Sequence, residues 1–201
     1  MIKKILIALA LAIAALLGYA ATQPDIFRVE RSTVVQAPAE QIYPLIADFH
    51  RWTQWSPYEK LDPALKRTYG GAESGLGASY AWEGDKNVGS GRMEITEATA
   101  PSKIGIKLDF MVPFEAHNQA EFTLQPEGSG TRVSWAMHGP ANFMSKLMGT
   151  LFNMDKMVGG DFEKGLATLK SVAEATPAAP AEIPAAAPVQ EPAPAAAAAG
   201  A

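Results

Sequence analysis

The 201-residue sequence has no cysteine and only three histidines, and both scarcities exclude kinds of functional site. Without cysteine, disulfides, thiolate zinc sites and cysteine nucleophiles are all excluded. His50, His117 and His138 are too few and too scattered for a convincing metal site. The sequence also shows no Ser–His–Asp set and no glycine-rich phosphate loop. We therefore expect no metal and no other cofactor.

Clusters of positive charge are also missing. The formal net charge is −4, and Lys3 and Lys4 are balanced by Glu182 and Glu191 near the other end. The whole negative charge therefore belongs to the residues between them. A mildly acidic chain without a Lys/Arg cluster is a poor match for a phosphate backbone. We expect no nucleic acid partner.

Residues 1–21 form an almost entirely apolar segment. No residue from Ile5 to Ala21 is charged, and Lys3 and Lys4 precede this run. Such a segment is either a cleaved signal peptide or a retained anchor that enters the membrane through residues 5–21. In both cases the lysines stay in the cytoplasm and the following chain is exported. We expect an inner-membrane anchor with a periplasmic domain, or a periplasmic protein if the segment is cleaved.

Residues 176–201 are dominated by two residue types, with 13 alanines and 6 prolines among these 26 positions. The segment contains no aromatic residue and cannot bury enough surface to offset the entropy of ordering it. The composition predicts a disordered, extended tail. Its alternative use is as a spacer that reaches the cell wall or a partner protein.

Residues 22–175 have the length of one domain, which buries a core without disulfides. The β-branched, alternating residues 25–36 predict a strand. Two short helices follow, the first starting near Pro38 and the second spanning 48–57, which includes Trp52 and Trp55. A helical region over 141–175 closes the domain, and Gly159-Gly160 predicts a break between a part ending at Val158 and a part starting at Asp161. Six more strands are predicted between the helices, over residues 65–69, 78–83, 91–98, 103–110, 116–125 and 131–138.

Alternation along these strands predicts a sheet with one apolar face. Ile104, Ile106 and Leu108 share one face of their strand, whereas Lys107 and Asp109 share the other. A half-buried sheet turns its apolar residues inward and its charged residues to water. We therefore expect a nearly uncharged interior, in which Asn118 and the Tyr80 hydroxyl are the main polar groups.

Four stretches of the sequence resemble those of a known family: residues 34–43 (VVQAPAEQIY), 47–57 (ADFHRWTQWSP), 75–82 (GLGASYAW) and 162–170 (FEKGLATLK). This pattern resembles the START/Bet v 1-like (SRPBCC) superfamily, of the polyketide cyclase/dehydrase and lipid-transport type. The resemblance spans about residues 27–175. It implies an α+β helix-grip fold, in which a curved seven-stranded antiparallel sheet surrounds a long C-terminal helix. It also implies a deep hydrophobic cavity between the sheet and this helix.

The alternation and the resemblance together predict which residues line the ligand. Asp48 and His50 are the best candidates for a catalytic pair, but a helix end with ordinary surface hydrogen bonds explains them better. The methionine-rich helix, with Met144, Met148, Met154 and Met157, either fills the core, lines the ligand, or contacts a membrane or partner. The predicted ligand-binding residues are Tyr80, Trp82, Met93, Ile95, Ile106, Leu108, Phe110, Asn118, Phe122, Trp135, Met137, Met144, Met148 and Phe162.

These observations favour a protein that binds a hydrophobic small molecule or lipid, because the predicted interior lacks ionisable groups for acid–base catalysis. Two alternatives remain open. One is an enzyme similar to polyketide cyclases or dehydratases, which the resemblance implies. The other is a non-catalytic envelope adaptor that binds proteins through the methionine-rich helix or the tail.

Overall fold

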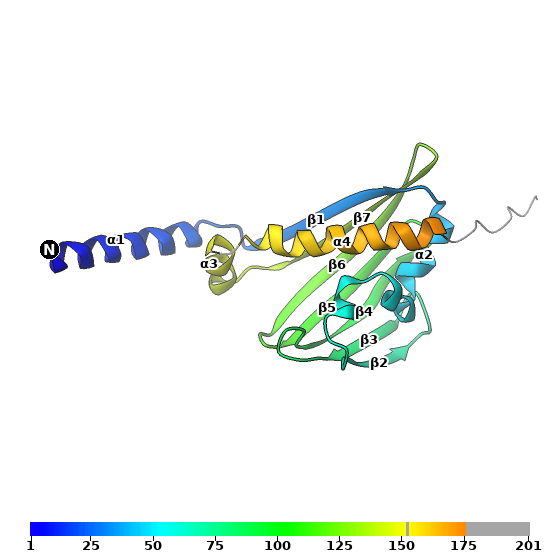
Figure 1. Cartoon of the computed structure of the whole chain (residues 1–201), viewed down its shortest axis with the longest axis horizontal. Coiled ribbons are helices and arrows are strands. Elements are labelled where there is room, and N and C mark those ends of the chain that lie inside the picture. Colours follow the sequence, from blue (N-terminus) through cyan, green and yellow to red (C-terminus); the bar gives the residue numbers. More distant parts are fainter. Residues whose placement is uncertain (152, 176–201) are drawn as a thin grey trace, which may run out of the picture.

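The computed structural model describes residues 1–151 and 153–175. Helices lie at both ends of the described residues, and between them one strand is followed by three short helices and then by six further strands (Figure 1). They are α1 (Ile2–Ala21), β1 (Ile26–Val35), α2 (Ala39–Ala47), the 3₁₀ helices η1 (Phe49–Gln54) and η2 (Pro57–Lys60), β2 (Lys66–Gly71), β3 (Ala78–Glu83), β4 (Ser90–Thr99), β5 (Lys103–Val112), β6 (Ala116–Glu127), β7 (Gly130–Pro140), α3 (Phe143–Leu151) and α4 (Met154–Ala175).

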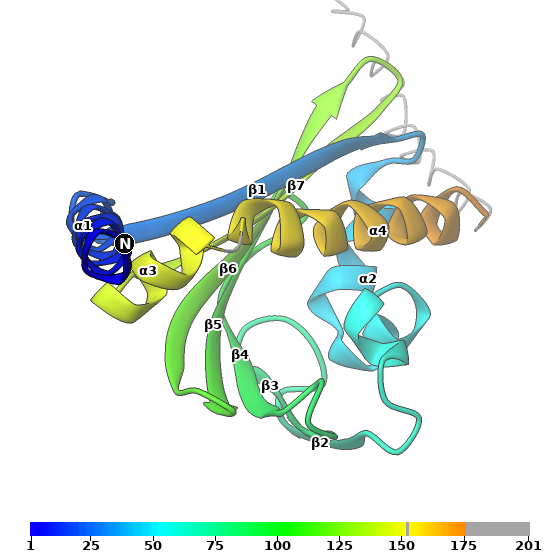
Figure 2. The same ribbon diagram turned by 60° about the vertical axis from the view of Figure 1, so that its left-hand side comes forward.

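The seven strands form one antiparallel sheet in the order β1-β7-β6-β5-β4-β3-β2. Strands β2 to β7 pair with their sequence neighbours, whereas β1 crosses over to pair with β7. Figure 2 shows the sheet curving from β1 and β7, beside α4, round to β2 and β3 below α2. This α+β architecture with its long C-terminal helix confirms the predicted helix-grip fold.

The strand register places distant segments at one end of the sheet. Ile26 pairs with Pro140, and Phe110 pairs with Ala116 next to the β5–β6 turn. The start of β1, the end of β7 and the β5–β6 turn therefore lie at the same end, from which α1 and α3 extend. We call it the α3 end of the sheet. The tip of the β6–β7 hairpin, between Glu127 and Gly130, lies at the opposite end.

Two tryptophans anchor the short helices. The indole Nε1 of Trp52 donates to the carbonyl oxygen of Ile46 at 2.9 Å, and that of Trp55 donates to the carbonyl oxygen of Leu45 at 2.8 Å. Both carbonyls lie in the last turn of α2, where no intrahelical donor remains for them. The tryptophans thus terminate α2 and fill the core beside it. The second predicted helix is realised as η1 and η2 rather than as one helix.

The predicted break at Gly159-Gly160 is wrong, because both glycines lie inside α4. The helix instead begins after Asn153, whose Oδ1 accepts a hydrogen bond from the backbone nitrogen of Lys156 at 2.9 Å. A Cβ atom on Gly159 would lie 2.1 Å from a guanidinium nitrogen of Arg31. This glycine therefore lets Arg31 on β1 reach Asp155 and Glu163, at 2.9 and 2.7 Å.

Helix α1 projects away from the domain as a separate rod (Figure 1). By length and composition it is suited to cross a membrane, and only a small part of it is buried. A signal sequence has the same length and composition, so this helix fits both outcomes expected for residues 1–21. Its C-terminal part packs against α3, and its Ala20 is fully buried. The tail predicted over 176–201 lies outside the described residues.

Candidate functional site

The concave face of the sheet is apolar along its length, and most of the predicted ligand-binding residues lie on it. The core residues among them are buried. Those placed there are Tyr80, Trp82, Met93, Ile95, Ile106, Asn118, Phe122, Trp135 and Met137, with Phe162 facing them from α4.

Stacked aromatic rings fill the part of this interior that lies beneath the middle of α4. Trp135 stacks on Phe162 with ring centroids 4.0 Å apart, and Phe122 lies 5.0 Å beyond Trp135. Trp55 meets both Phe122 and Trp135 edge-on. Dense aromatic packing of this kind stabilises the fold and occupies the volume. Ligand space must therefore be sought elsewhere on the concave face.

The α3 end of the concave face is covered less completely. Leu108 and Phe110 on β5 are partly buried, whereas Ile104 and Ile106 of the same strand are fully covered. Asn118 on β6 is a buried polar residue here. A Cβ atom on Gly139 would lie 2.2 Å from Asn118 Oδ1, so the glycine provides the room for this amide. An apolar surface with one orienting polar group is the usual composition of a ligand site.

Met144 and Met148 are not brought to this interior. Both side chains are exposed on α3, a helix without a single buried residue. The structure thus leaves these two out of the core cluster that contains most of the other predicted ligand-binding residues.

The expectation of a nearly uncharged interior was incomplete, because it missed Glu59. This residue of η2 has a side chain only 5% exposed. Its Oε1 accepts a hydrogen bond from the Tyr80 hydroxyl at 2.7 Å, and its Oε2 accepts one from Arg67 Nε at 2.6 Å. The predicted burial of Tyr80 was the one indication that such a residue exists, because a buried tyrosine hydroxyl normally has a hydrogen-bond partner.

The electrostatics of this cluster follow from burial and from the carboxylate. Burial raises the pKa of Tyr80, and the hydrogen bond to Glu59 raises it further. The pKa of Arg67 is raised mainly by its hydrogen bond to the same carboxylate. Tyr80 is therefore held as a neutral donor and Arg67 as a cation. A buried carboxylate paired in this way stabilises a local geometry, and it also presents an acid–base group close to the concave face.

Asp48 and His50 lie together, with His50 Nδ1 2.9 Å from Asp48 Oδ1. Asp48 also accepts a hydrogen bond from the backbone nitrogen of His50 and thereby caps η1. The imidazole stacks on Tyr69 at 4.0 Å, and Tyr69 lies 5.2 Å from Tyr80. The pair is thus joined through aromatic rings to the Glu59 cluster, but more than half of the His50 side chain is exposed.

Two small hollows lie at the β2–β3 edge of the sheet. One, of about 190 Å³, is lined by His50, Tyr69 and the Gly70–Glu73 segment, among others. The other, of about 240 Å³, lies beside Thr68, Arg92 and Glu94. Neither is lined by α4, so neither is the cavity implied between sheet and C-terminal helix.

Asp109 is buried, whereas the strand alternation predicted that charged residues on its face would be exposed to water. It lies on the outer face as expected, yet it is buried there. Its Oδ1 lies 2.8 Å from His117 Nδ1, and its Oδ2 lies 3.2 Å from Lys107 Nζ and 3.5 Å from Arg92 Nε. Long side chains from β4, β5 and β6 therefore cover a carboxylate on the face that meets water.

Among the described residues, no group of three or more His, Asp or Glu side chains is placed to hold a metal ion.

Comparison with known proteins agrees with the fold. The family model described as "Polyketide cyclase / dehydrase and lipid transport" matches residues 27–174, which is most of the chain. The chain belongs to this family. No curated protein matches the sequence.

Solved structures share the architecture at low sequence identity. A protein from Chromobacterium violaceum is similar with a TM-score of 0.53 and 15% identity, covering 77% of this chain and 100% of that chain. An uncharacterized protein from Rhizobium leguminosarum has a TM-score of 0.54 and 11% identity, covering 74% and 95%. The di-domain ARO/CYC protein BexL from the BE-7585A biosynthetic pathway has a TM-score of 0.56 and 14% identity, covering 80% and 54%. At these identities the likeness shows the fold alone.

Proposed function

We propose that this protein binds a hydrophobic small molecule or a lipid chain against the concave face of its sheet, at the α3 end, while α1 tethers it to a membrane. The family includes lipid transport in its description, which supports this class of ligand. The main observation that supports this site is that Leu108 and Phe110 are only partly buried, although they lie on an apolar face that is otherwise buried. Apolar side chains left partly open in this way gain free energy when an apolar ligand covers them.

One polar group is suited to orient such a ligand. Asn118 presents an amide on the concave face, next to the partly buried Leu108 and Phe110. An amide both donates and accepts hydrogen bonds. We therefore expect a ligand with a long apolar part and at least one hydrogen-bonding group.

The tether follows from α1 and its flanking charges. Twenty helical residues span about 30 Å, the thickness of a hydrocarbon core. Lys3 and Lys4 precede this span, and positive charge favours the cytoplasmic side. The domain is then exported, to the periplasm in a bacterium with two membranes. Retention of α1 makes it an anchor, whereas cleavage releases the domain.

Extraction of the bound molecule tests the proposal. The full chain is purified by affinity in mild detergent, and organic extracts are analysed by mass spectrometry. We expect a stoichiometric apolar compound from the wild type and its loss from Leu108→Lys. Leu76→Lys is the matched control, because Leu76 is exposed in the β2–β3 loop and its substitution leaves the ligand bound. Equal recovery from wild type and Leu108→Lys would contradict this binding site.

One specific observation favours a second candidate function, that of a cyclase- or dehydratase-like enzyme. Glu59 and Tyr80 form a buried acid–base pair beside the concave face, at 2.7 Å. Such a pair could exchange a proton with a substrate that reaches it. Incubation of the full chain with linear polyketide thioesters tests this, with Glu59→Gln as the comparison. Turnover that is abolished in Glu59→Gln favours catalysis over binding alone.

A further inference from the structure

Helix α3 exposes apolar side chains and covers a charged one, which is the reverse of a typical helix in a soluble domain. The side chain of Lys146 is only 11% exposed. In contrast, Met144 is 62% exposed, and Met148 and Leu151 are also exposed. At 3.6 residues per turn these three apolar residues share one face, away from Lys146. A surface helix usually turns such a stripe toward the core.

An ion pair fixes this orientation. Lys146 Nζ lies 2.6 Å from Oδ1 of Asp25, the residue just before β1. The backbone nitrogen of Ala141, just before α3, donates to the carbonyl oxygen of Asp25 at 2.8 Å. Only residues 22–25 separate α1 from β1. These contacts hold α3 beside the point where α1 leaves the domain, with the apolar stripe facing outward.

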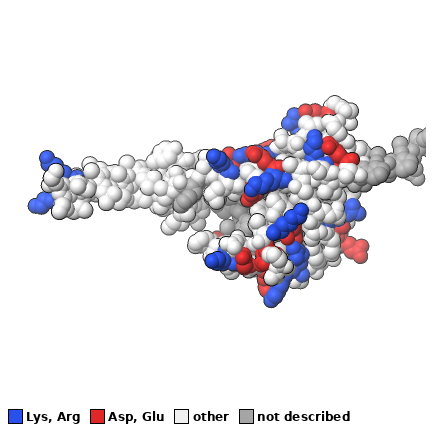
Figure 3. All heavy atoms as spheres, viewed as in Figure 1, with Lys and Arg blue, Asp and Glu red and all other residues white. Residues whose placement is uncertain are grey.

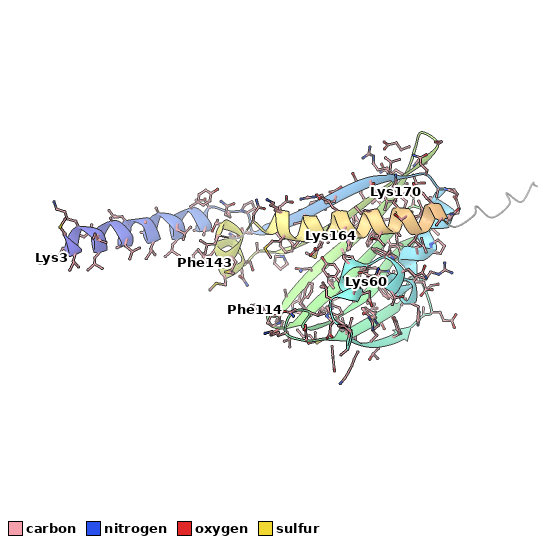
Figure 4. The ribbon with its side chains drawn as sticks, viewed as in Figure 1. Lys3, Lys60, Phe114, Phe143, Lys164 and Lys170 are labelled. Atoms are coloured by element: carbon pink, nitrogen blue, oxygen red, sulfur yellow. The ribbon has the colours of Figure 1, made fainter. Side chains whose placement is uncertain are left out.

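A second exposed apolar segment lies at the same end of the sheet. The end of β5 exposes Met111 and Val112, and the β5–β6 turn exposes Phe114 by 82%. Figure 4 shows Phe114 and Phe143 at the end of the domain that faces α1, with Lys3 at the far tip of α1. We call Phe143, Met144, Met148, Leu151, Met111, Val112 and Phe114 the apolar end surface.

The surroundings of this surface indicate what covers it. In Figure 3 the charged side chains gather over the domain, while α1 between its tip and the domain carries none. Tyr19 is exposed near the C-terminal end of α1, a position typical of tyrosines at a membrane–water boundary. The apolar end surface thus continues directly from the end of an apolar rod.

We propose that the apolar end surface docks on the lipid bilayer that α1 enters, so that α3 lies in the interfacial region with its methionines among the acyl chains. This inference rests on the membrane tether of the proposed function. An amphipathic helix lies in the membrane interface with its apolar face buried at the boundary between headgroups and acyl chains. Docking orients the domain and turns the open part of the concave face, near Phe110, toward the lipid. The domain is then held against the membrane surface and does not move freely about its connection to α1.

Because the chain has no cysteine, single labels can report depth in the bilayer. The full chain is reconstituted in vesicles of phosphatidylethanolamine and phosphatidylglycerol. Variants Met148→Cys and Phe114→Cys carry an environment-sensitive fluorophore. Lipids with a nitroxide near the headgroup act as the quencher in one set of vesicles, and lipids with a nitroxide deep on the acyl chain act as the quencher for position 14 in another. Ser171→Cys on the exposed side of α4 is the control outside the bilayer, and Ala14→Cys inside α1 is the control within it.

The expected result is quenching at positions 148 and 114 about twofold or more above that at position 171. The double substitution Met144→Asp with Met148→Asp should return the label at position 114 to the level of position 171. These side chains are exposed, so the fold is retained.

Quenching at position 14 alone would overturn docking and leave the tether intact. No quenching at position 14 would overturn the tether and docking with it. Ligand binding is judged separately, by extraction.

Discussion

The indole ring of Trp135 on β7 and the phenyl ring of Phe162 on α4 stack face to face, with centroids 4.0 Å apart and planes 9° apart. This contact joins the sheet to the C-terminal helix at its centre. Both rings are almost fully buried, and Trp55 and Phe122 extend the stack. Aromatic packing at this point, together with the ion pairs of Arg31 on β1 with Asp155 and Glu163, therefore holds α4 against the sheet.

Truncating this stack should strongly destabilise the domain. Phe162→Ala leaves a cavity that rigid rings cannot fill, so we expect a loss of about 3–5 kcal/mol in the free energy of unfolding. Urea denaturation followed by tryptophan fluorescence measures it. The matched control is Phe114→Ala, the same substitution at an exposed site, which should change stability by about 0.5 kcal/mol or less in detergent. Equal losses in both variants would contradict the central role of the stack.

Two glycines of α4 should respond to alanine with opposite signs. A Cβ atom at Gly165 would lie 2.8 Å from the Trp135 ring and 3.0 Å from Pro57, so Gly165→Ala overpacks the core at about 1–3 kcal/mol. Nothing lies within 4 Å of a Cβ atom at Gly160. Gly160→Ala should therefore stabilise the helix by about 0.5–1 kcal/mol. Thermal unfolding of the two variants decides this, and destabilisation by Gly160→Ala would count against a continuous α4.

Removing Arg67 should leave a buried carboxylate without its partner. We expect Arg67→Met to cost about 3 kcal/mol, because Glu59 is then buried and only partly compensated. Lys66→Met, its neighbour on β2, removes an exposed pair with Glu83 at 3.9 Å and should cost about 0.5 kcal/mol or less. Adding Glu59→Gln to Arg67→Met should recover part of the loss. A double variant as unstable as the sum of the single variants would show that the pair is not coupled.

The contact between Asp109 and His117 should be visible in a titration. The hydrogen bond to Asp109 raises the pKa of His117 above its ordinary 6.5, and the same bond lowers the pKa of Asp109 below 3.8. The histidine's contribution to stability is present below pH 6.5 and is lost as the pH rises through its folded pKa. The carboxylate's contribution is present above pH 3.8 and is lost as the pH falls through its folded pKa. The interaction is therefore fully formed between these two values.

Nuclear magnetic resonance titration of the imidazole checks this directly. Asp109→Asn should return the pKa of His117 toward 6.5. Glu115→Gln should have the smaller effect, because Glu115 lies 3.3 Å from the other ring nitrogen and contributes less to the shift. A pKa of His117 that is unchanged in Asp109→Asn would show that the two groups do not interact in solution.

Local patterns were sufficient to predict the order of helices and strands, whereas the helix-grip arrangement followed from the resemblance to the START/Bet v 1-like superfamily. Alternation identified every strand, and the apolar stripe of Ile42, Leu45 and Ile46 identified α2, because these periodicities follow from backbone geometry alone. The error at Gly159-Gly160 has a different origin. Glycine breaks helices on average, but here it makes room for Arg31, a residue more than 120 positions away in the sequence.

The candidate site was predictable only in part, for the same reason. Alternation placed Leu108, Asn118 and Trp135 on the concave face, where the structure has them. Glu59 was missed because η2 is too short to show a periodicity, and its burial depends on the distant Arg67 and Tyr80. The outward position of Met148 was equally hidden, because it depends on contacts of α3 with segments distant in the sequence, among them the ion pair between Lys146 and Asp25 and the packing against α1.

The most direct measurement maps where an apolar ligand is held. The full chain in vesicles is irradiated with a photoactivatable fatty acid that carries a diazirine on its chain, and cross-linked peptides are sequenced by mass spectrometry. The account predicts cross-links on the concave residues of β5 to β7, around Leu108, Phe110 and Asn118, that an excess of unlabelled fatty acid removes. Cross-links confined to α1 and the apolar end surface, with none on these strands, would contradict binding in the interior.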